Sequence, residues 1–167
     1  MCETSDLGYP VVLSMRGRHA VVVGGGAVGE RKVRALLRAE ARITLISPTA
    51  TPALAALAED RRIAWRSHRY ASCDLSDDAA IVIACTDSRR TNRQVCEDAR
   101  LRRSDATDWR LVNDASDPTY SDFANVAQIR HDGTLITVST GGSSPARARS
   151  MKQRIAAWLE GRTSSRT

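Results

Sequence analysis

The feature of this sequence that most constrains its fold is an apolar run that ends in three glycines and is followed by a helical pattern. Residues His19–Val23 are rich in β-branched side chains, which favours a buried strand. Gly24–Gly26 follow directly, and from Ala27 onward apolar residues recur at helical spacing among charged ones. A strand that leads through a tight turn into an amphipathic helix predicts an α/β fold.

The alternation of strands and helices continues to about residue 115. Further strands are predicted at Arg42–Ile46, Arg62–Trp65, Ala79–Ala84 and Arg110–Asn113, with helices at Pro52–Glu59 and Thr91–Leu101. Parallel neighbouring strands can be joined only by crossover segments, so this order predicts a Rossmann-like parallel sheet covered on both faces.

The pattern changes in the last third of the chain. Two strand-like runs are predicted at Ala124–Arg130 and Thr134–Thr140. The intervening His131-Asp132-Gly133 is typical of a hairpin turn, because glycine can adopt a positive φ. A final helix is predicted, with Ser144 as its N-cap, Pro145 as its first residue and Gly161 at its end.

The glycines at 24, 26 and 29 form a G-x-G-x-x-G pattern between the first strand and the first helix. In dinucleotide-binding folds the first glycine permits the turn, the second lets the backbone approach a pyrophosphate, and the third lets helix and strand pack closely. Backbone N–H groups at the helix start bind the phosphates. A glycine turn that serves packing alone is the alternative. The predicted phosphate-binding residues are Gly24, Gly25, Gly26, Ala27, Val28 and Gly29.

Two further segments belong to the predicted cofactor site. In this fold the second strand commonly ends with a carboxylate for the adenosine ribose, but Ser47-Pro48-Thr49 stands there, which leaves NAD and NADP both open. Thr86 and Asp87 end the fourth predicted strand, where such a sheet exposes its ligand crevice, and capping of the next helix is their alternative role. The predicted cofactor ligands therefore include Ser47, Pro48 and Thr86.

Composition limits the classes of ligand. The chain has 167 residues and a net charge of +6, and 23 of its 25 basic residues are arginines. Arginine grips carboxylates and phosphates through a planar fork of donors, which favours a polyanionic ligand. With seven aromatic residues, a stacking surface for single-stranded nucleic acid is disfavoured.

The sequence also bears on compartment and metal binding. The longest apolar run, Ala79–Cys85, is far shorter than the roughly 20 residues of a membrane span, and no signal-peptide pattern is seen. The four cysteines form no C-x-x-C pair, so reduced thiols and a cytoplasmic location without membrane attachment are expected. No spacing of His, Cys and carboxylates resembles a metal site.

Several motifs occur in the order found in one known family. They are Pro10–Leu13, expected as a strand; Gly24–Val28 with Arg31-Lys32; Ile83–Asp87 with Asn92; Val112-Asn113; Asp117-Pro118; Phe123; and Val138–Pro145. Over roughly residues 9–160 the sequence resembles the precorrin-2 dehydrogenase family of sirohaem synthesis. The pairing of the glycine loop and Arg31-Lys32 with the late Gly-Gly-Ser-Ser-Pro loop is specific.

The resemblance implies an enzyme that oxidises precorrin-2 to sirohydrochlorin with NAD, and some family members also insert ferrous iron. Because the substrate is a polycarboxylate, it also implies substrate contacts from Ser116, Gly141, Gly142, Ser143, Arg147 and Arg149. Family members are dimers whose hairpin segments pair across the two chains. We therefore expect a Rossmann domain over 1–115, a dimerisation and substrate segment over 116–161, and a disordered tail over 162–167.

The sequence departs from the family at the expected catalytic base. The family usually has Asn-Val-Val-Asp-Asp-Pro, so its first aspartate aligns with Ser116 here and its second with Asp117. Asp114 is an additional carboxylate two positions before Ser116. We expect Asp117 to be the base, because it matches the family pair and Pro118 restricts its backbone, with Asp114 as the alternative.

Two other departures concern Glu40 and the chain's end. Glu40 stands where the family usually has glycine, at a position expected to be left-handed. The chain ends soon after its last helix, so part of the tetrapyrrole cleft is expected to be missing or supplied by a partner.

Two other classes of function compete with the dehydrogenase. A non-catalytic Rossmann sensor that binds the dinucleotide is the first, and Ser116 and the short C-terminus favour it. A nucleic-acid-binding module is suggested by the basic charge. No helix-turn-helix or RNA motif is present, so no nucleic-acid partner is expected.

Overall fold

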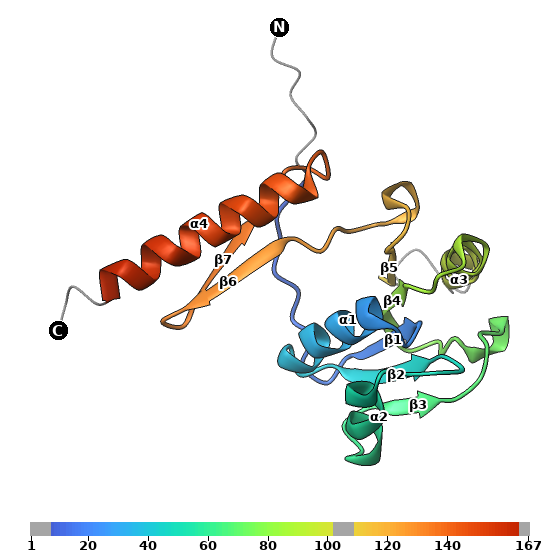
Figure 1. The fold of residues 1–167 in the computed structure, drawn as a ribbon. Coiled ribbons are helices and arrows are strands. Elements are labelled where there is room, and N and C mark those ends of the chain that lie inside the picture. The colour runs from blue at the N-terminus through green and yellow to red at the C-terminus, as the bar shows by residue number, and fades with distance from the viewer. Residues whose placement is uncertain (1–7, 102–108, 164–167) are drawn as a thin grey trace, which may run out of the picture. The chain divides into compact units, whose positions relative to one another are not determined.

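A five-stranded parallel sheet with strand order β3-β2-β1-β4-β5 is the centre of the fold (Figure 1). The computed structural model describes residues 8–101 and 109–163. The strands are β1 (His19–Val23), β2 (Arg42–Ile46), β3 (Ala64–Arg66), β4 (Ala79–Ala84) and β5 (Leu111–Asp114). The predicted Rossmann-like sheet is therefore confirmed.

Helices cover both faces of this sheet. They are α1 (Ala27–Arg38), α2 (Pro52–Glu59) and α3 (Arg89–Leu101), with 3-10 turns η1 (Ser72–Asp74) and η2 (Pro118–Tyr120). Val33 of α1 and Leu54 of α2 belong to the same core as Val22 of β1. Val95 of α3 packs in a second core with Val21, the neighbour of Val22 that points to the other face. Because β1 is buried on both faces, its sequence is apolar without interruption after His19.

The order of the strands reverses next to β1. The chain runs outward from β1 through β2 to β3, then crosses to β4 and β5 on the other side. Ligands of such sheets bind outside the carboxyl ends of the strands at this switch point. Backbone hydrogen bonds extend the pairing there, from Cys85 N–H to Val23 O (2.8 Å) and from Gly24 N–H to Ile46 O (3.0 Å).

A left-handed residue ends α1 as expected. Glu40 has φ 60°, and its N–H donates to Leu37 O (3.0 Å), while the N–H of Ala41 donates to Leu36 O (3.1 Å). Arg16 donates to the Glu40 carboxylate at 3.0 Å. Glu40 therefore adopts the conformation that usually favours glycine.

A second compact unit contains residues 8–12 and 124–163 of the described chain. Its elements are β6 (Ala127–His131), β7 (Thr134–Val138) and α4 (Pro145–Thr163). β6 and β7 form an antiparallel hairpin, and α4 lies against both strands (Figure 1). Asp132 (φ 44°) and Gly133 (φ 71°) both have positive φ, as a type I′ turn requires, which confirms the predicted hairpin.

Two sequence-based expectations in this unit and its N-terminal segment are wrong. Pro10–Leu13 forms no strand in the structure, and Val12 is 82% exposed. Gly161 does not end α4, which continues to Thr163, because one glycine costs a helix only about 1 kcal/mol. The start of α4 is as expected, since Ser144 Oγ accepts a hydrogen bond from Arg147 N–H (3.2 Å).

The expected roles of the segments after the sheet, dimerisation and substrate binding over 116–161 and a disordered tail over 162–167, stay predictions. Residues 162 and 163 continue α4, and the disorder expected for 164–167 lies outside the described residues.

Among the helices of the described chain, none combines the length and apolar character needed to cross a membrane.

Candidate dinucleotide-binding site

A cleft of about 520 Å³ opens at the carboxyl ends of β1, β2 and β4. Its lining residues are Val23, Gly24, Gly25, Gly26, Ile46, Ser47, Pro48, Thr49, Arg69, Tyr70, Cys85, Thr86, Asp87, Ser88, Thr91 and Gln94. The structure thus brings most of the predicted cofactor residues to one cleft. The others, Ala27, Val28 and Gly29, form the first turn of α1, whose N-cap Gly26 lines the cleft.

The three glycines of the G-x-G-x-x-G pattern differ in what a side chain at each position would meet. Gly24 has φ 118°, and an added Cβ would lie 2.6 Å from Cys85 O. At Gly29 an added Cβ would lie 1.9 Å from Gly24 O, so the helix packs too closely on the loop for any side chain. At Gly26 an added Cβ would meet no atom within 4 Å. Only Gly26 of these three therefore leaves open space, which fits close approach of a pyrophosphate.

The start of α1 offers unused backbone donors. The N–H groups of Ala27, Val28 and Gly29 have no acceptor within the helix, because they lie in its first turn. Gly26 provides no side-chain cap for them. Three donors and the positive end of the helix dipole thus fit a bound anion, so the residues present suit a dinucleotide.

Ser47 fixes the geometry of the glycine loop. Its buried hydroxyl accepts a hydrogen bond from Gly25 N–H at 2.9 Å, and its carbonyl accepts one from the Trp65 indole N–H at 2.9 Å. An added Cβ at Gly25 would lie 2.1 Å from Thr49 O. The turn after β2 therefore packs directly on the glycine loop.

Asn92, fully buried near the start of α3, joins the end of β4 to the loop after β5. Its Oδ1 accepts hydrogen bonds from the N–H (2.9 Å) and the hydroxyl (2.7 Å) of Thr86. Its Nδ2 donates to Thr86 O (3.2 Å) and to Ser116 Oγ (3.1 Å). Sequence reasoning assigned Asn92 no role, although an amide on the apolar face of an amphipathic helix is a signal that could have shown one.

Asp114 is a buried carboxylate at the end of β5. Its Oδ1 accepts hydrogen bonds from Ser116 Oγ (2.6 Å), Ser116 N–H (2.8 Å) and Asp117 N–H (3.2 Å). A continuous chain of hydrogen bonds therefore runs from Thr86 in the cleft through Asn92 and Ser116 to Asp114.

Asp117 faces a different set of partners. It is half-buried and is the N-cap of η2, where its Oδ1 accepts hydrogen bonds from the Thr119 hydroxyl (2.6 Å) and N–H (3.0 Å). The hydrogen bond from the Thr119 hydroxyl lowers the pKa of Asp117 most, and the bond from the Thr119 N–H lowers it further below its ordinary value. The carboxylate is therefore ionised at neutral pH.

Interactions with α1 and α3 hold the segment from β5 to η2 in place. Arg100 of α3 donates to Tyr120 O (2.9 Å) and to the Asp122 carboxylate (3.0 Å). Lys32 of α1 donates to Asn113 Oδ1 (3.4 Å), and burial lowers the pKa of its ammonium group. Lys32 belongs to the Arg31-Lys32 pair of the family motif, and the structure gives it a contact at the end of β5.

Cys85 is the thiol that lines the cleft. Its Sγ donates to Val23 O at 3.3 Å, and burial raises its pKa to about 11. At neutral pH it is therefore a protonated thiol and a poor nucleophile. Within residues 8–101 and 109–163, His, Cys and carboxylate groups form no cluster of three that could hold a metal ion.

The predicted substrate residues beyond the sheet lie in the second unit. Gly141 (φ 60°) and Gly142 (φ 81°) form the turn between β7 and α4, where Ser143 Oγ donates to Thr140 O (2.5 Å). Arg147 and Arg149 are exposed in the first turns of α4. Their contacts with a substrate stay a prediction.

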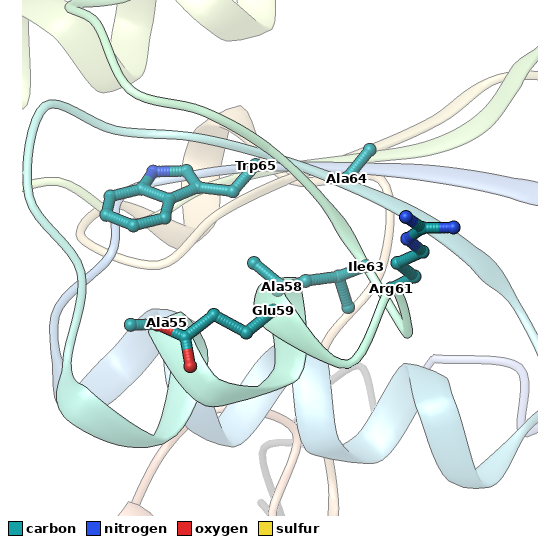
Figure 2. A pocket seen from close by; sticks show the side chains of 7 residues that line it. All are labelled: Ala55, Ala58, Glu59, Arg61, Ile63, Ala64 and Trp65. Atoms are coloured by element: carbon teal, nitrogen blue, oxygen red, sulfur yellow. The ribbon is translucent and has the colours of Figure 1, made fainter.

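A second hollow, of about 620 Å³, lies between α2 and β3 (Figure 2). It is lined by Ala55, Ala58, Glu59, Arg61, Ile63, Ala64 and Trp65. Its wall is mainly apolar, and no predicted site residue contributes to it. Trp65 also bonds to Ser47 through its indole N–H, so this wall supports the turn beside the dinucleotide cleft.

Comparisons with known proteins identify relatives of the chain. The family model described as "Putative NAD(P)-binding" matches residues 11–127. Siroheme synthase 1 of Klebsiella pneumoniae subsp. pneumoniae is 32% identical over 150 residues, which cover 90% of this chain and 30% of that protein. The siroheme synthase of Gluconacetobacter diazotrophicus is 37% identical over 162 residues, which cover 94% of this chain and 33% of that protein. The chain thus spans about a third of the length of these curated relatives.

A solved structure shares the fold over most of the chain. SirC, precorrin-2 dehydrogenase, matches with a TM-score of 0.76 at 24% identity, over 90% of this chain and 70% of that chain. This likeness confirms the fold, including the hairpin and the last helix. Because the family model matches more than half of the sequence, the chain belongs to the NAD(P)-binding domain family that it shares with siroheme synthases and SirC.

Proposed function

We propose that this chain is a dehydrogenase that oxidises precorrin-2 to sirohydrochlorin with NAD in sirohaem synthesis. The observation that carries the proposal is the hydrogen-bond chain that connects the glycine-loop cleft, through Asn92, to a carboxylate at Asp114. A hydride acceptor and a base are the two groups that such an oxidation requires. The similarity to siroheme synthases and SirC supports the same activity.

The cofactor would be held by the residues of the cleft and of the first turn of α1. These are Gly24, Gly25, Gly26, Ala27, Val28, Gly29, Ser47, Pro48 and Thr86. When bound, NAD supplies the carbon that accepts a hydride. The chain's own part is to bind the phosphates with backbone donors and to orient the dinucleotide along the edge of the sheet.

The geometry supports Asp114, acting through Ser116, as the base. Loss of hydride from the substrate leaves a proton to be removed, and the base must lie within hydrogen-bond reach of it. Ser116 is exposed, and its Oγ already donates to Asp114 Oδ1 at 2.6 Å. The Ser116 oxygen would take the substrate proton while its own proton passes to Asp114. Asp117, which the sequence favours, remains the alternative, with an ionised carboxylate three residues along.

Substrate binding is proposed for the second unit. Precorrin-2 is a polycarboxylate, and the exposed guanidinium groups of Arg147 and Arg149 suit it, together with Gly141, Gly142 and Ser143. The hairpin should also pair with a second copy of the chain. In the described part of this unit Ile129 is the one buried residue, which is too small a core for independent stability.

A non-catalytic sensor is the second candidate. The observation that favours it is Ser116, which stands where the family usually has its first aspartate. A sensor would bind the dinucleotide in the same cleft but produce no reduced nicotinamide.

An anaerobic assay with precorrin-2 and NAD distinguishes the two candidates. A dehydrogenase gives reduced nicotinamide and the absorbance of sirohydrochlorin, whereas NAD binding without either product indicates a sensor. Ferrous iron added after oxidation tests chelation, which would appear as conversion of the sirohydrochlorin spectrum to that of sirohaem.

A further inference from the structure

The ammonium group of Lys32 is a half-buried cation without a counter-charge. Lys32 lies in the second turn of α1, and its Nζ donates to Asn113 Oδ1 of β5 at 3.4 Å. An ammonium group has three N–H donors, but within residues 8–101 and 109–163 this long contact is its single hydrogen bond, and no carboxylate pairs with it. Burial lowers the pKa of Lys32, because a cation that leaves water unpaired is destabilised. A bound anion would offset that cost.

The acceptor of this contact is itself held in place. Asn113 is 6% exposed, and its Nδ2 donates to Phe123 O (2.9 Å) and to Ser121 Oγ (3.3 Å). With its amide nitrogen engaged in this way, Asn113 directs its Oδ1 to Lys32. The ammonium group therefore has a fixed place beside the carboxyl end of β5, with donors left for a ligand.

Lys32 stands on the side of the switch point where the substrate must meet the nicotinamide. The adenosine ribose of a dinucleotide binds after β2, so the nicotinamide half extends past β1 toward β4 and β5. Cys85 lines the cleft at the end of β4. Burial raises the pKa of its thiol, and the nearby charge of Lys32 opposes that rise. Lys32 thus lies next to the cleft, between the end of β4 and the end of β5.

The proposed base lies at the same end of β5. Asn113 and Asp114 are consecutive in the strand, so their side chains point to opposite faces of the sheet. Lys32 contacts Asn113 on one face, and Ser116 donates to Asp114 on the other. A substrate that lies over the carboxyl end of β5 would therefore meet a cation on one side and the Ser116–Asp114 pair on the other.

We propose that Lys32 binds one carboxylate of the tetrapyrrole substrate at the carboxyl end of β5. The inference rests on the proposed function and deepens it, because it names a substrate ligand within the sheet unit. A carboxylate accepts charge-assisted hydrogen bonds from an ammonium group, and these are stronger than bonds between neutral groups. Because this ammonium group is partly removed from water, its attraction for a carboxylate exceeds that of a fully exposed cation.

Anaerobic kinetics with precorrin-2 and NAD test this proposal. Lys32→Met keeps most of the side-chain volume but removes the charge, so it should raise KM for precorrin-2 about 10- to 100-fold and change kcat less than about threefold. NAD affinity in calorimetry should stay within about twofold of the wild type, because the change removes a substrate contact alone. Arg38→Met is the control, since Arg38 is exposed in the last turn of α1, and it should leave KM unchanged.

The pH dependence of KM separates charge from structure. Between about pH 7 and 9.5 the KM of the wild type should rise as Lys32 loses its proton, because its pKa lies below the ordinary value. Lys32→Arg should keep KM within about threefold of the wild type at pH 7 and show no such rise, because a guanidinium stays protonated. The ionisable groups that face Lys32, Cys85 of β4 and Arg31 of α1, keep their charge over this range, since the pKa of Cys85 is about 11.

Two results would overturn the inference and leave the dehydrogenase intact. One is an unchanged KM in Lys32→Met, and the other is the same rise of KM with pH in Lys32→Arg as in the wild type. Should Lys32→Met fail to fold, as judged by circular dichroism, the pH profiles of the wild type and Lys32→Arg decide alone. A wild-type chain that forms no reduced nicotinamide from precorrin-2 and NAD would overturn both this inference and the proposed function.

Discussion

Gly26 is the position where one side chain should separate binding from folding. An added Cβ there meets no protein atom within 4 Å, and the residue lines the cleft. We predict that Gly26→Asp abolishes NAD binding in calorimetry. The carboxylate would occupy the space of the pyrophosphate and would also repel its negative charge. The circular dichroism spectrum and the Tm should stay near those of the wild type.

A matched control exists at Gly161, where an added Cβ also meets no atom within 4 Å. Gly161→Asp places the same side chain in α4 and should keep wild-type NAD affinity. A folded Gly26→Asp protein that still binds NAD normally would remove the assignment of the phosphate loop.

The identity of the base is also decided at the residue scale. We predict that Asp114→Asn and Ser116→Ala each lower kcat for precorrin-2 by roughly 10² to 10⁴, the usual contribution of a general base. NAD affinity should change little, because neither residue lines the cleft. Asp117→Asn should mainly loosen η2, which it caps through Thr119. Loss of turnover in Asp117→Asn with full activity in Asp114→Asn would reverse the assignment.

At the scale of elements, Asp78 joins three segments at the amino edge of the sheet. Its carboxylate accepts hydrogen bonds from His19 of β1 (2.7 Å), Arg42 of β2 (2.8 Å) and the hydroxyl of Ser76. The hydrogen bond from Ser76, followed by those from His19 and Arg42, holds the pKa of Asp78 well below its ordinary value. The ionised carboxylate therefore stabilises the folded state.

This arrangement predicts a pH-dependent stability. Because the pKa is lower in the folded state, the stabilisation is complete above the unfolded pKa and is lost as the pH falls toward the folded pKa. The Asp78 side chain is 53% exposed, so the effect is modest. In urea unfolding, Asp78→Asn should lower the free energy of unfolding by about 1 kcal/mol at pH 7. The difference should shrink between about pH 5 and 2.

The exposed Asp60, just after α2, provides the control: Asp60→Asn should leave stability and its pH dependence nearly unchanged. A loss in Asp78→Asn that is equal at acid and neutral pH would show that ionisation of Asp78 contributes nothing.

The order and type of the elements could be predicted from the sequence, but several boundaries could not. β3 begins at Ala64 rather than Arg62, because Arg62 N–H donates to Leu57 O and so ends α2. α3 begins at Arg89 rather than Thr91, because Ser88 Oγ accepts a hydrogen bond from Thr91 N–H and caps the helix. Both shifts depend on single hydrogen bonds, which hydrophobic periodicity does not encode.

The candidate site likewise has one part that could be predicted from the sequence and one part that could not. The glycine loop has a local pattern, and the structure places it in a cleft as that pattern predicts. The chain through Asn92 and Ser116 has no local pattern, because these residues are 24 positions apart and meet only when α3 packs beside β5. Arg110 is 1% exposed, and its guanidinium donates to Ala79 O and Asp77 O. Its burial could not be predicted from the sequence either, since arginine is rarely buried.

At the scale of the whole molecule, we predict a homodimer formed through the second unit. The sheet unit has two cores of its own, whereas the described hairpin and α4 bury a single residue, Ile129. Light scattering at tens of micromolar should give the mass of two chains. A chain shortened after Phe123 should be monomeric and folded. A monomeric full chain, or a dimer that survives the truncation, would contradict this assembly.

The most direct test of the proposed function is the stoichiometry of anaerobic precorrin-2 oxidation by the purified chain. We predict equal amounts of reduced nicotinamide and sirohydrochlorin, both formed at a rate proportional to the amount of protein and both absent with Gly26→Asp. Tight binding of NAD and precorrin-2 without any reduced nicotinamide would contradict the dehydrogenase and leave the dinucleotide sensor as the function of this chain.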